Sequence, residues 1–212
     1  LNIQFVWEFE EEIGSPNFEH FVKNRVVDLK TDSVVVSDTI WLSRDRPAIP
    51  FGLRGLLTAR VYLETGSRDV HSGLTGGVAR NPLTELCTLI ADCYDRETRR
   101  VNISGFYENV LPPDEEAIQG FLDSGFNPEV FREAHGLIHM KETEAARMVR
   151  RLWTRPTFEV HGIVGGYSGH GVKTSIPARA EAKLSMRLVP DQSPQRQFDL
   201  LKLFLKEQNP DV

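Results

Sequence analysis

Residues 178–189 read ARAEAKLSMRLV, and this stretch decides the fold. Small or apolar residues occupy every second position, and charged residues and one serine occupy the positions between them. This alternation predicts a β-strand with one face in a core and the other in solvent. The apolar face consists of Ala178, Ala180, Ala182, Leu184, Met186 and Leu188, and the polar face of Arg179, Glu181, Lys183, Ser185 and Arg187.

The segments around this strand predict two helices and a second strand. A helix is expected over 194–208, with Phe198, Leu201 and Leu205 inward. A half-buried strand is expected where Leu57, Ala59, Val61 and Leu63 alternate with polar residues. A helix follows, with Asn81 as its N-cap and Pro82 at its first position. Its apolar stripe is expected to be Leu83, Leu86, Cys87, Ile90, Ala91 and Tyr94.

The order of these elements, strand–helix and then strand–strand–helix, predicts an α+β fold with helices on one face of an antiparallel sheet. Between the two halves, residues 96–156 are expected to be helical and loop-like. Helix starts are expected at Asp114 and near Thr143, and the second helix must end before Pro156. A last strand of the sheet is expected after Val212.

The first 50 residues predict part of a different domain, of the α/β class. Residues 2–8 and 34–38 resemble buried strands, and residues 17–27 can form a short helix. We therefore expect a partial α/β domain over 1–50 and an α+β domain over 51–212. The chain opens in what looks like a strand and lacks an initiating Met, so we interpret it as an internal piece of a longer protein.

Composition excludes several classes of function. The chain has 212 residues and a formal net charge of −5, with no run of basic residues, which argues against a nucleic-acid partner. No apolar stretch approaches the ~20 residues that span a bilayer. The spacing of Cys87 and Cys93 is no metal or redox motif, so we expect reduced thiols in a cytoplasmic protein.

Four stretches carry candidate functional residues. His71 lies in the loop Asp69–Gly77, whose glycines let the backbone approach a ligand closely. The adjacent carboxylates Glu11 and Glu12 could bind a metal and take a proton from its water, or could be a solvated acidic loop. Asp38 could be a further oxygen ligand or a turn former. Arg187 could grip a substrate carboxylate or could be a surface arginine.

Taken in order, these motifs resemble a family of dinuclear-zinc peptidases that includes carnosinase-type dipeptidases, and the carnosinase-like branch fits best. The matching stretches cover nearly the whole chain, most weakly over 96–150. They are residues 8–15 (EFEEEIGS), 36–41 (VSDTIW), 68–73 (RDVHSG) with Gly76-Gly77 and Asn81-Pro82, 171–177 (GVKTSIP) and 186–190 (MRLVP).

The resemblance implies a role for each candidate residue. Glu11 would be the general base, and Glu12 and Asp38 would bind two divalent metal ions, with zinc expected and manganese or cobalt as alternatives. His71 would stabilise the oxyanion in the active site of the other subunit of a homodimer. Thr174 would help to bind the substrate there. Residues from 51 onward would form a ferredoxin-like lid, or dimerisation, domain, and Arg187 would hold the carboxylate of a small peptide substrate.

The resemblance also exposes a gap. The family's site needs a histidine and a bridging aspartate upstream, and a histidine downstream, and the chain contains neither region. A zinc ion needs three or four protein ligands, so the 212 residues alone are expected to be inactive. The function we expect of the parent protein is hydrolysis of a peptide bond next to a residue with a free carboxylate. Two alternatives stay open, an amidohydrolase acting on N-acyl amino acids and a non-catalytic dimerisation module.

Overall fold

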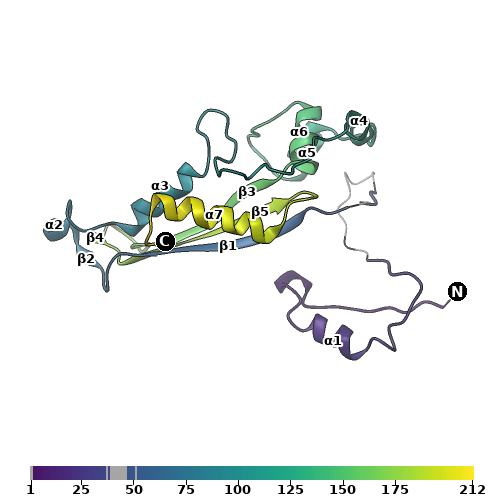
Figure 1. Ribbon diagram of the computed structural model, residues 1–212, viewed down its shortest axis with the longest axis horizontal. Helices are drawn as coiled ribbons and strands as arrows, with labels where there is room; N and C mark the ends of the chain where they lie inside the picture. The colour runs from purple at the N-terminus through teal and green to yellow at the C-terminus, as the bar shows by residue number, and fades with distance from the viewer. Residues whose placement is uncertain (1, 37, 39–46, 51) are drawn as a thin grey trace. The chain divides into compact units, whose positions relative to one another are not determined.

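The computed structural model describes residues 2–36, 38, 47–50 and 52–212. The chain divides into two compact units, Leu1–Ile40 and Trp41–Val212, and each is described by itself. The second unit contains the sheet and most of the helices (Figure 1). The end of the matching stretch 36–41, with Trp41, lies outside the described residues.

Within the described part of the second unit, three strands form an antiparallel sheet. They are β1 (Gly55–Glu64), β3 (Thr157–Gly165) and β5 (Arg179–Leu188), in the spatial order β1–β5–β3. The strand predicted from residues 178–189 is therefore the central one. Ala182 pairs with Val61 on one side and with Ile163 on the other. The apolar face is confirmed, because Ala180, Ala182, Leu184, Met186 and Leu188 are all buried. The polar face is confirmed only in part, because Ser185 is also buried, with its hydroxyl 2.7 Å from Nε2 of His161.

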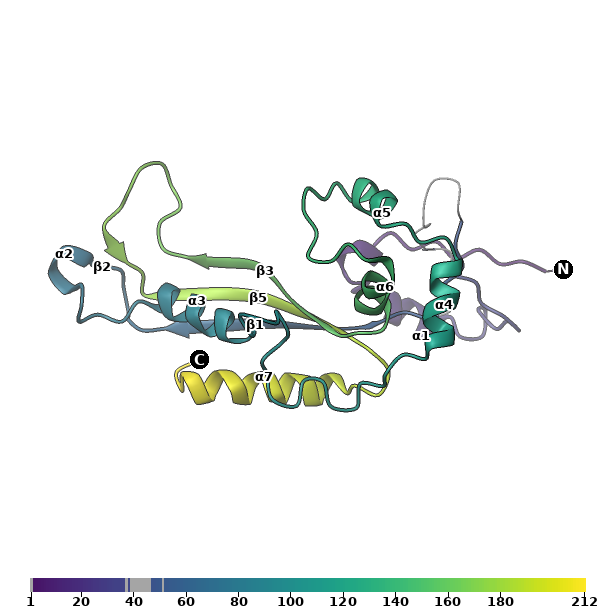
Figure 2. The ribbon, with the colours of Figure 1, turned by 90° about the horizontal axis from the view of Figure 1, so that it is seen from above.

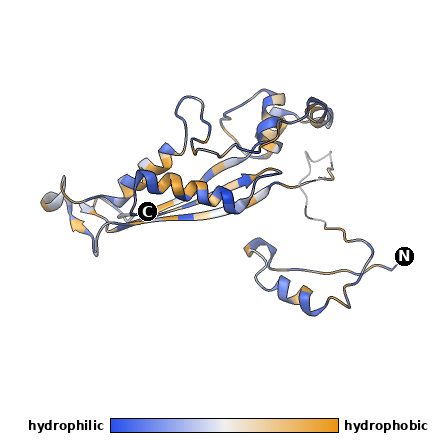
Figure 3. Ribbon diagram, in the orientation of Figure 1, coloured by the Kyte–Doolittle hydropathy of each residue, from blue (hydrophilic) through white to orange (hydrophobic). Residues whose placement is uncertain are grey.

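Two helices cover one face of this sheet, α3 (Pro82–Asp92) and α7 (Pro194–Gln208) (Figure 1). Each begins at an N-cap residue, Asn81 as predicted for α3 and Ser193 for α7. The Asn81 side chain accepts a hydrogen bond from the Leu83 amide at 3.1 Å, and the Ser193 hydroxyl accepts one from the Arg196 amide. The apolar residues of α7 are visible as orange segments in Figure 3. Two helices on one face of an antiparallel sheet confirm the predicted α+β class.

The inward faces of the helices differ in part from the prediction. Cys87 and Ala91 are exposed, whereas Leu89 and Cys93 are buried with Leu86 and Ile90. In α7, Phe198 is 38% exposed and Gln197 is buried beside Leu201 and Leu205. The hydrophobicity of the residues does not predict the buried face of a helix to within one position, because packing against the sheet decides which residues lie inward. The side-chain nitrogen of Gln197 donates to the Phe106 carbonyl oxygen at 3.4 Å, whereas its buried Oε1 has no hydrogen-bond partner among the described residues.

Short elements lie at the two ends of the sheet (Figure 2). One end carries a small ribbon of β2 (Val70–His71) and β4 (Ser175–Ile176), with α2 (Ser72–Thr75). The other end carries three helices, α4 (Glu115–Asp123), α5 (Pro128–Ala134) and α6 (Ala145–Trp153). The predicted start at Asp114 is confirmed, since Asp114 caps α4. The helix expected near Thr143 begins at Ala145 and ends before Pro156.

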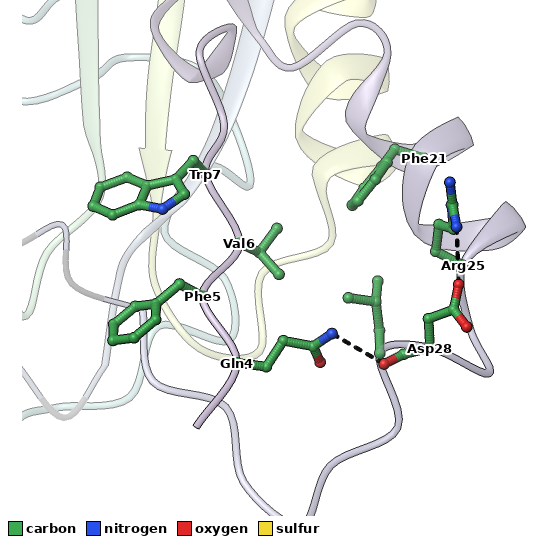
Figure 4. Close-up of a pocket in the computed structure, with 8 residues that line it drawn as sticks. Gln4, Phe5, Val6, Trp7, Phe21, Arg25 and Asp28 are labelled. Atoms are coloured by element: carbon green, nitrogen blue, oxygen red, sulfur yellow. Dashed lines mark hydrogen bonds and ion pairs between the residues drawn. The ribbon is translucent and has the colours of Figure 1, made fainter. Parts of the chain in front are cut away.

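The first unit contains a 3-10 turn, η1 (Glu11–Ile13), and the predicted helix, α1 (Phe18–Asn24). The two predicted strands are wrong: residues 2–8 and 34–36 form no strand and are largely exposed. A strand needs a neighbour for its backbone hydrogen bonds, and apolar residues alone do not supply one. Residues 4–7 are still extended. Gln4 and Val6 point toward Phe21 of α1, and Phe5 and Trp7 point away (Figure 4).

No helix among the described residues is long and apolar enough to span a bilayer.

The first prediction concerns the core between the sheet and α3. Leu86 is fully buried, so we expect Leu86→Ala to lower the free energy of unfolding by about 2–5 kcal/mol. Leu203→Ala, at a site that is 57% exposed, is the matched control and should change it by less than about 0.5 kcal/mol. Urea denaturation of the chain measures both, and equal effects would contradict this core.

The second prediction concerns the two free cysteines. Cys93 is buried, and burial raises the pKa of its thiol to about 12, while Cys87 is exposed. The thiolate is the reactive form, so a thiol reagent at neutral pH should label Cys87 quickly and Cys93 only when the protein unfolds. The variants Cys87→Ala and Cys93→Ala assign each reaction, and similar rates in the native protein would contradict this packing.

Candidate active site

The β2–β4 ribbon places the predicted histidine. Val70 pairs with Ile176 and His71 pairs with Ser175, so two segments about a hundred residues apart in sequence lie side by side. The His71 side chain itself is exposed. The loop motif and the Lys-Thr motif that looked separate in the sequence therefore form one structure.

Further hydrogen bonds extend this contact on both sides of the ribbon. The amide and the hydroxyl of Ser72 both donate to the Thr174 carbonyl oxygen, at 3.0 and 3.2 Å. At the other side, the Ala178 amide donates to Oδ1 of Asp69 at 3.1 Å, and the Ala178 carbonyl accepts from the Thr65 amide at 2.9 Å. The two segments are thus joined at Thr65 and at each residue from Asp69 to Ser72.

The side chains of His71 and Thr174 converge. Thr174 Oγ1 lies 3.5 Å from Nε2 of His71, and both residues are exposed. The other ring nitrogen, Nδ1, accepts a hydrogen bond from the Gly73 amide at 2.8 Å. The arrangement presents one imidazole N–H or lone pair and one hydroxyl to the same point in solvent, which suits binding of a polar group of a substrate.

Arg187 lies on the polar face of β5, opposite Leu56 of β1 and Thr157 of β3. It is exposed and makes no ion pair within the described residues. Arg54 precedes β1 and donates to the Arg155 carbonyl at 3.2 Å. Burial lowers the pKa of Arg54, and the nearby charge of Arg187 lowers it further, whereas Glu159 opposes the shift. The site is positive and suits a carboxylate.

The three predicted acidic residues belong to the first unit. Glu11 and Glu12 form η1 and are exposed, as is Asp38. Their neighbour Glu10 has a structural role, because its carboxylate accepts hydrogen bonds from the amide and side chain of Asn17. The Glu11 and Glu12 carboxylates make no hydrogen bond or ion pair to the part of the chain that the structure describes, so both are available to a ligand.

These carboxylates fit a hard divalent metal ion as part of a ligand set. Carboxylate oxygens bind zinc, magnesium and manganese, and an unpaired carboxylate can bind without breaking an internal contact. No group of three or more histidine, cysteine, aspartate or glutamate side chains that could hold a metal occurs among the described residues. Glu12 and Asp38 are thus suitable donors, but the described residues do not complete a metal site.

Sequence reasoning missed Arg54 as a neighbour of Arg187 and missed the contacts of Asp69 and Gly73. Nothing in the local pattern around Arg54 marks it. Its position beside Arg187 follows only from the pairing of Leu56 with Arg187, which depends on the register of β1 against β5. Asp69 and Gly73 stood inside the quoted motif, but the partner of Asp69 is the Ala178 amide in a distant segment, and the partner of the Gly73 amide is the His71 ring, whose orientation the sequence does not show.

The second unit is thus an α+β domain whose ribbon presents His71 and Thr174 at one end of its sheet. Residues 51–212 match the family model described as the peptidase dimerisation domain of the M20 type. The match covers most of the chain, and the chain belongs to this family. The resemblance seen in the motifs is confirmed.

Curated relatives support the dipeptidase branch. The chain is 33% identical over 195 residues to the Cys-Gly metallodipeptidase dug1 of Schizosaccharomyces pombe, which covers 90% of this chain and 40% of that protein. It is also 33% identical to the Beta-Ala-His dipeptidase of Homo sapiens, which covers 90% of this chain and 38% of that protein. The chain thus spans about 40% of the length of these relatives.

Solved structures agree. An M20 family metallo-carboxypeptidase from Sulfolobus solfataricus has a TM-score of 0.82 and 37% sequence identity, over 95% of this chain and 46% of that one. Human carnosine dipeptidase 1 has a TM-score of 0.83 and 29% identity, over 93% of this chain and 42% of that one. The similarity reaches most of the chain and so includes more than the sheet domain.

Proposed function

We propose that the complete protein is a metal-dependent dipeptidase that hydrolyses a peptide bond next to a residue with a free carboxylate. The observation that carries this proposal is the convergence of His71 and Thr174, 3.5 Å apart at the end of the lid, in a chain similar to metallodipeptidases. Residues 1–50 would belong to the catalytic domain and residues 51–212 to the lid. The remaining metal ligands would come from parts of the protein outside this chain.

Each candidate residue has one chemical task in this proposal. Glu12 and Asp38 would hold two divalent metal ions, zinc first and manganese or cobalt as alternatives. When bound, the ions would lower the pKa of a water molecule and polarise the substrate carbonyl. Glu11 would accept the proton from that water and pass it to the leaving amine. His71 would donate a hydrogen bond to the oxyanion.

Arg187 would bind the carboxylate of the substrate, and Thr174 would bind a polar group beside His71. These tasks cannot all be met by one copy of the lid. Arg179 begins β5 and Arg187 is close to its end, so at about 3.3 Å per residue they lie about 26 Å apart. Thr174 lies beyond the Arg179 end, at the ribbon (Figure 2).

A dipeptide spans only about 7 Å when extended. The length of β5 therefore supports a homodimer in which Arg187 of one copy and His71 and Thr174 of the other serve the same substrate. The exposed side chains of His71 and Arg187, with the adjacent carboxylates Glu11 and Glu12, are the reason to prefer an enzyme over a dimerisation module without activity. We further propose a cytoplasmic location, which the two free cysteines support.

The third prediction tests the general base. In the complete protein, Glu11→Gln should lower kcat by about 10²–10⁴-fold, because glutamine cannot accept the proton. The matched control is Glu19→Gln on the surface of α1, which should retain activity. Bound metal, measured by elemental analysis, should be unchanged in Glu11→Gln. Turnover within about tenfold of wild type would refute this role.

The substrate panel for this assay should contain dipeptides and N-acyl amino acids. Faster hydrolysis of dipeptides is the expected result. Preference for N-acyl amino acids would favour the amidohydrolase alternative.

The fourth prediction tests the shared site. Glu11→Gln and His71→Gln proteins should each be inactive, but mixing them under conditions that exchange subunits should restore activity. A mixed dimer would have one site with both mutations and one site with neither. The activity of the mixture should approach about a quarter of wild type at equal amounts, since random exchange makes about half of the dimers mixed. Mixing Glu11→Gln with Glu11→Ala is the control, and no recovery in the first mixture would contradict sharing.

A further inference from the structure

The proposed function requires a hydrogen-bond donor at Nε2 of His71. A nearby backbone amide determines whether Nε2 carries the proton. The ring is exposed, so a buried environment does not hold its orientation. Its Nδ1 nevertheless has a definite partner, the Gly73 amide at 2.8 Å. A backbone N–H can only donate, so Nδ1 must be the unprotonated nitrogen whenever this contact exists.

We propose that Gly73 and Asp69 are positioning residues for His71. The Gly73 amide would set the orientation of the ring and its tautomer, and Asp69 would hold the ribbon that carries it. The effect of this positioning on catalysis rests on the proposed function, but the hydrogen bond between Gly73 and His71 can be measured without any enzymatic turnover.

The consequence lies in the second ring nitrogen. A neutral imidazole has one N–H, and with Nδ1 as an acceptor that N–H is at Nε2. Nε2 is the atom that lies 3.5 Å from the Thr174 hydroxyl, on the exposed side of the ribbon. The ring can therefore donate a hydrogen bond to a substrate oxygen while it is uncharged, with no need to gain a proton first.

Glycine at position 73 is required for this contact by space. A Cβ at Gly73 would lie 2.8 Å from Cε1 and 3.0 Å from Nδ1 of His71, closer than carbon atoms normally approach. Position 73 is within α2 and does not have a left-handed backbone, so alanine suits its conformation. Because the crowded atoms belong to an exposed side chain, the ring would move aside and the backbone would remain.

Asp69 acts at the other end of the short ribbon. Its carboxylate accepts from the Ala178 amide, and β2 and β4 pair through only two residues each. So short a ribbon has few hydrogen bonds of its own, and the Asp69 contact ties it to the start of β5. An asparagine could still accept this hydrogen bond through its side-chain oxygen, whereas an alanine could not.

The decisive experiment is NMR spectroscopy of the ¹⁵N-labelled chain, with the His71 signals assigned from His71→Gln. At neutral pH we expect a scalar coupling across the hydrogen bond between the Gly73 amide nitrogen and Nδ1 of His71. The ring should show a protonated Nε2. A neutral ring with its proton on Nδ1, or no coupling in the folded chain, would overturn the inference.

The fifth prediction extends this test to variants. Gly73→Ala should lose the coupling and, in the complete protein, should lower kcat by about 10- to 100-fold, with KM changed by less than about threefold. Gly66→Ala is the matched control, because its Cβ would make only an ordinary 3.7 Å contact with the Arg68 carbonyl oxygen, and it should behave as wild type.

Asp69→Ala should lower kcat in the same way, and Asp69→Asn should restore most of it. Normal kcat in a Gly73→Ala protein that has lost the coupling would overturn the positioning role. The NMR result contains no catalytic step, so it separates a failure of this inference from a failure of the proposed dipeptidase function.

Discussion

The pairing of β5 with a neighbour on each side is the constraint on which the second unit depends. β5 bonds to β1 and to β3, and no other strand among the described residues is paired on both sides. Its alternate residues form the floor on which α3 and α7 pack. Two of the five buried residues on this face of β5, Ala180 and Ala182, are small enough for a close helix approach, and Ala182 is completely buried. A shift of one residue would send these side chains into solvent and the charged ones into the core.

The same strand separates the polar sites of the lid. One end leads through β4 to Thr174 and His71, and the other end carries Arg187 with Arg54 beside it. A rigid strand of this length keeps the two sets apart by more than a small peptide can span. Because of this separation, one copy could not bring both sets of residues to the same small peptide. Two copies could do so if each contributed one end of its β5 to the shared site. Dimerisation and chemistry would then depend on the same structural element.

Local signals in the sequence predicted a helix or strand correctly where the residues of that element alone specify its conformation. The alternation in residues 178–189, the Asn81-Pro82 start of α3 and the span 194–208 of α7 all agree with the structure. The strands expected at 2–8 and 34–38 are not found at the described residues of these ranges. Their apolar residues favour extended backbone, but a strand exists only when another strand is beside it. The buried faces of α3 and α7 also differ in part from the predicted faces, because packing against the sheet selects which of their residues are buried.

By itself, the sequence determined the class of the fold and the family, because these depend on periodicity and on local motifs. It also named Glu11, Glu12, Asp38, His71, Thr174 and Arg187 as candidate site residues, and only the family resemblance related His71 to Thr174. Only the tertiary structure decided that His71 meets Thr174 and that Arg187 lies beside Arg54. It also decided that the Gly73 amide meets Nδ1 of His71. The first two contacts arise from ribbon pairing and strand register, of which a linear pattern carries no record, whereas the Gly73 contact is local and depends on how the chain turns from His71 into α2.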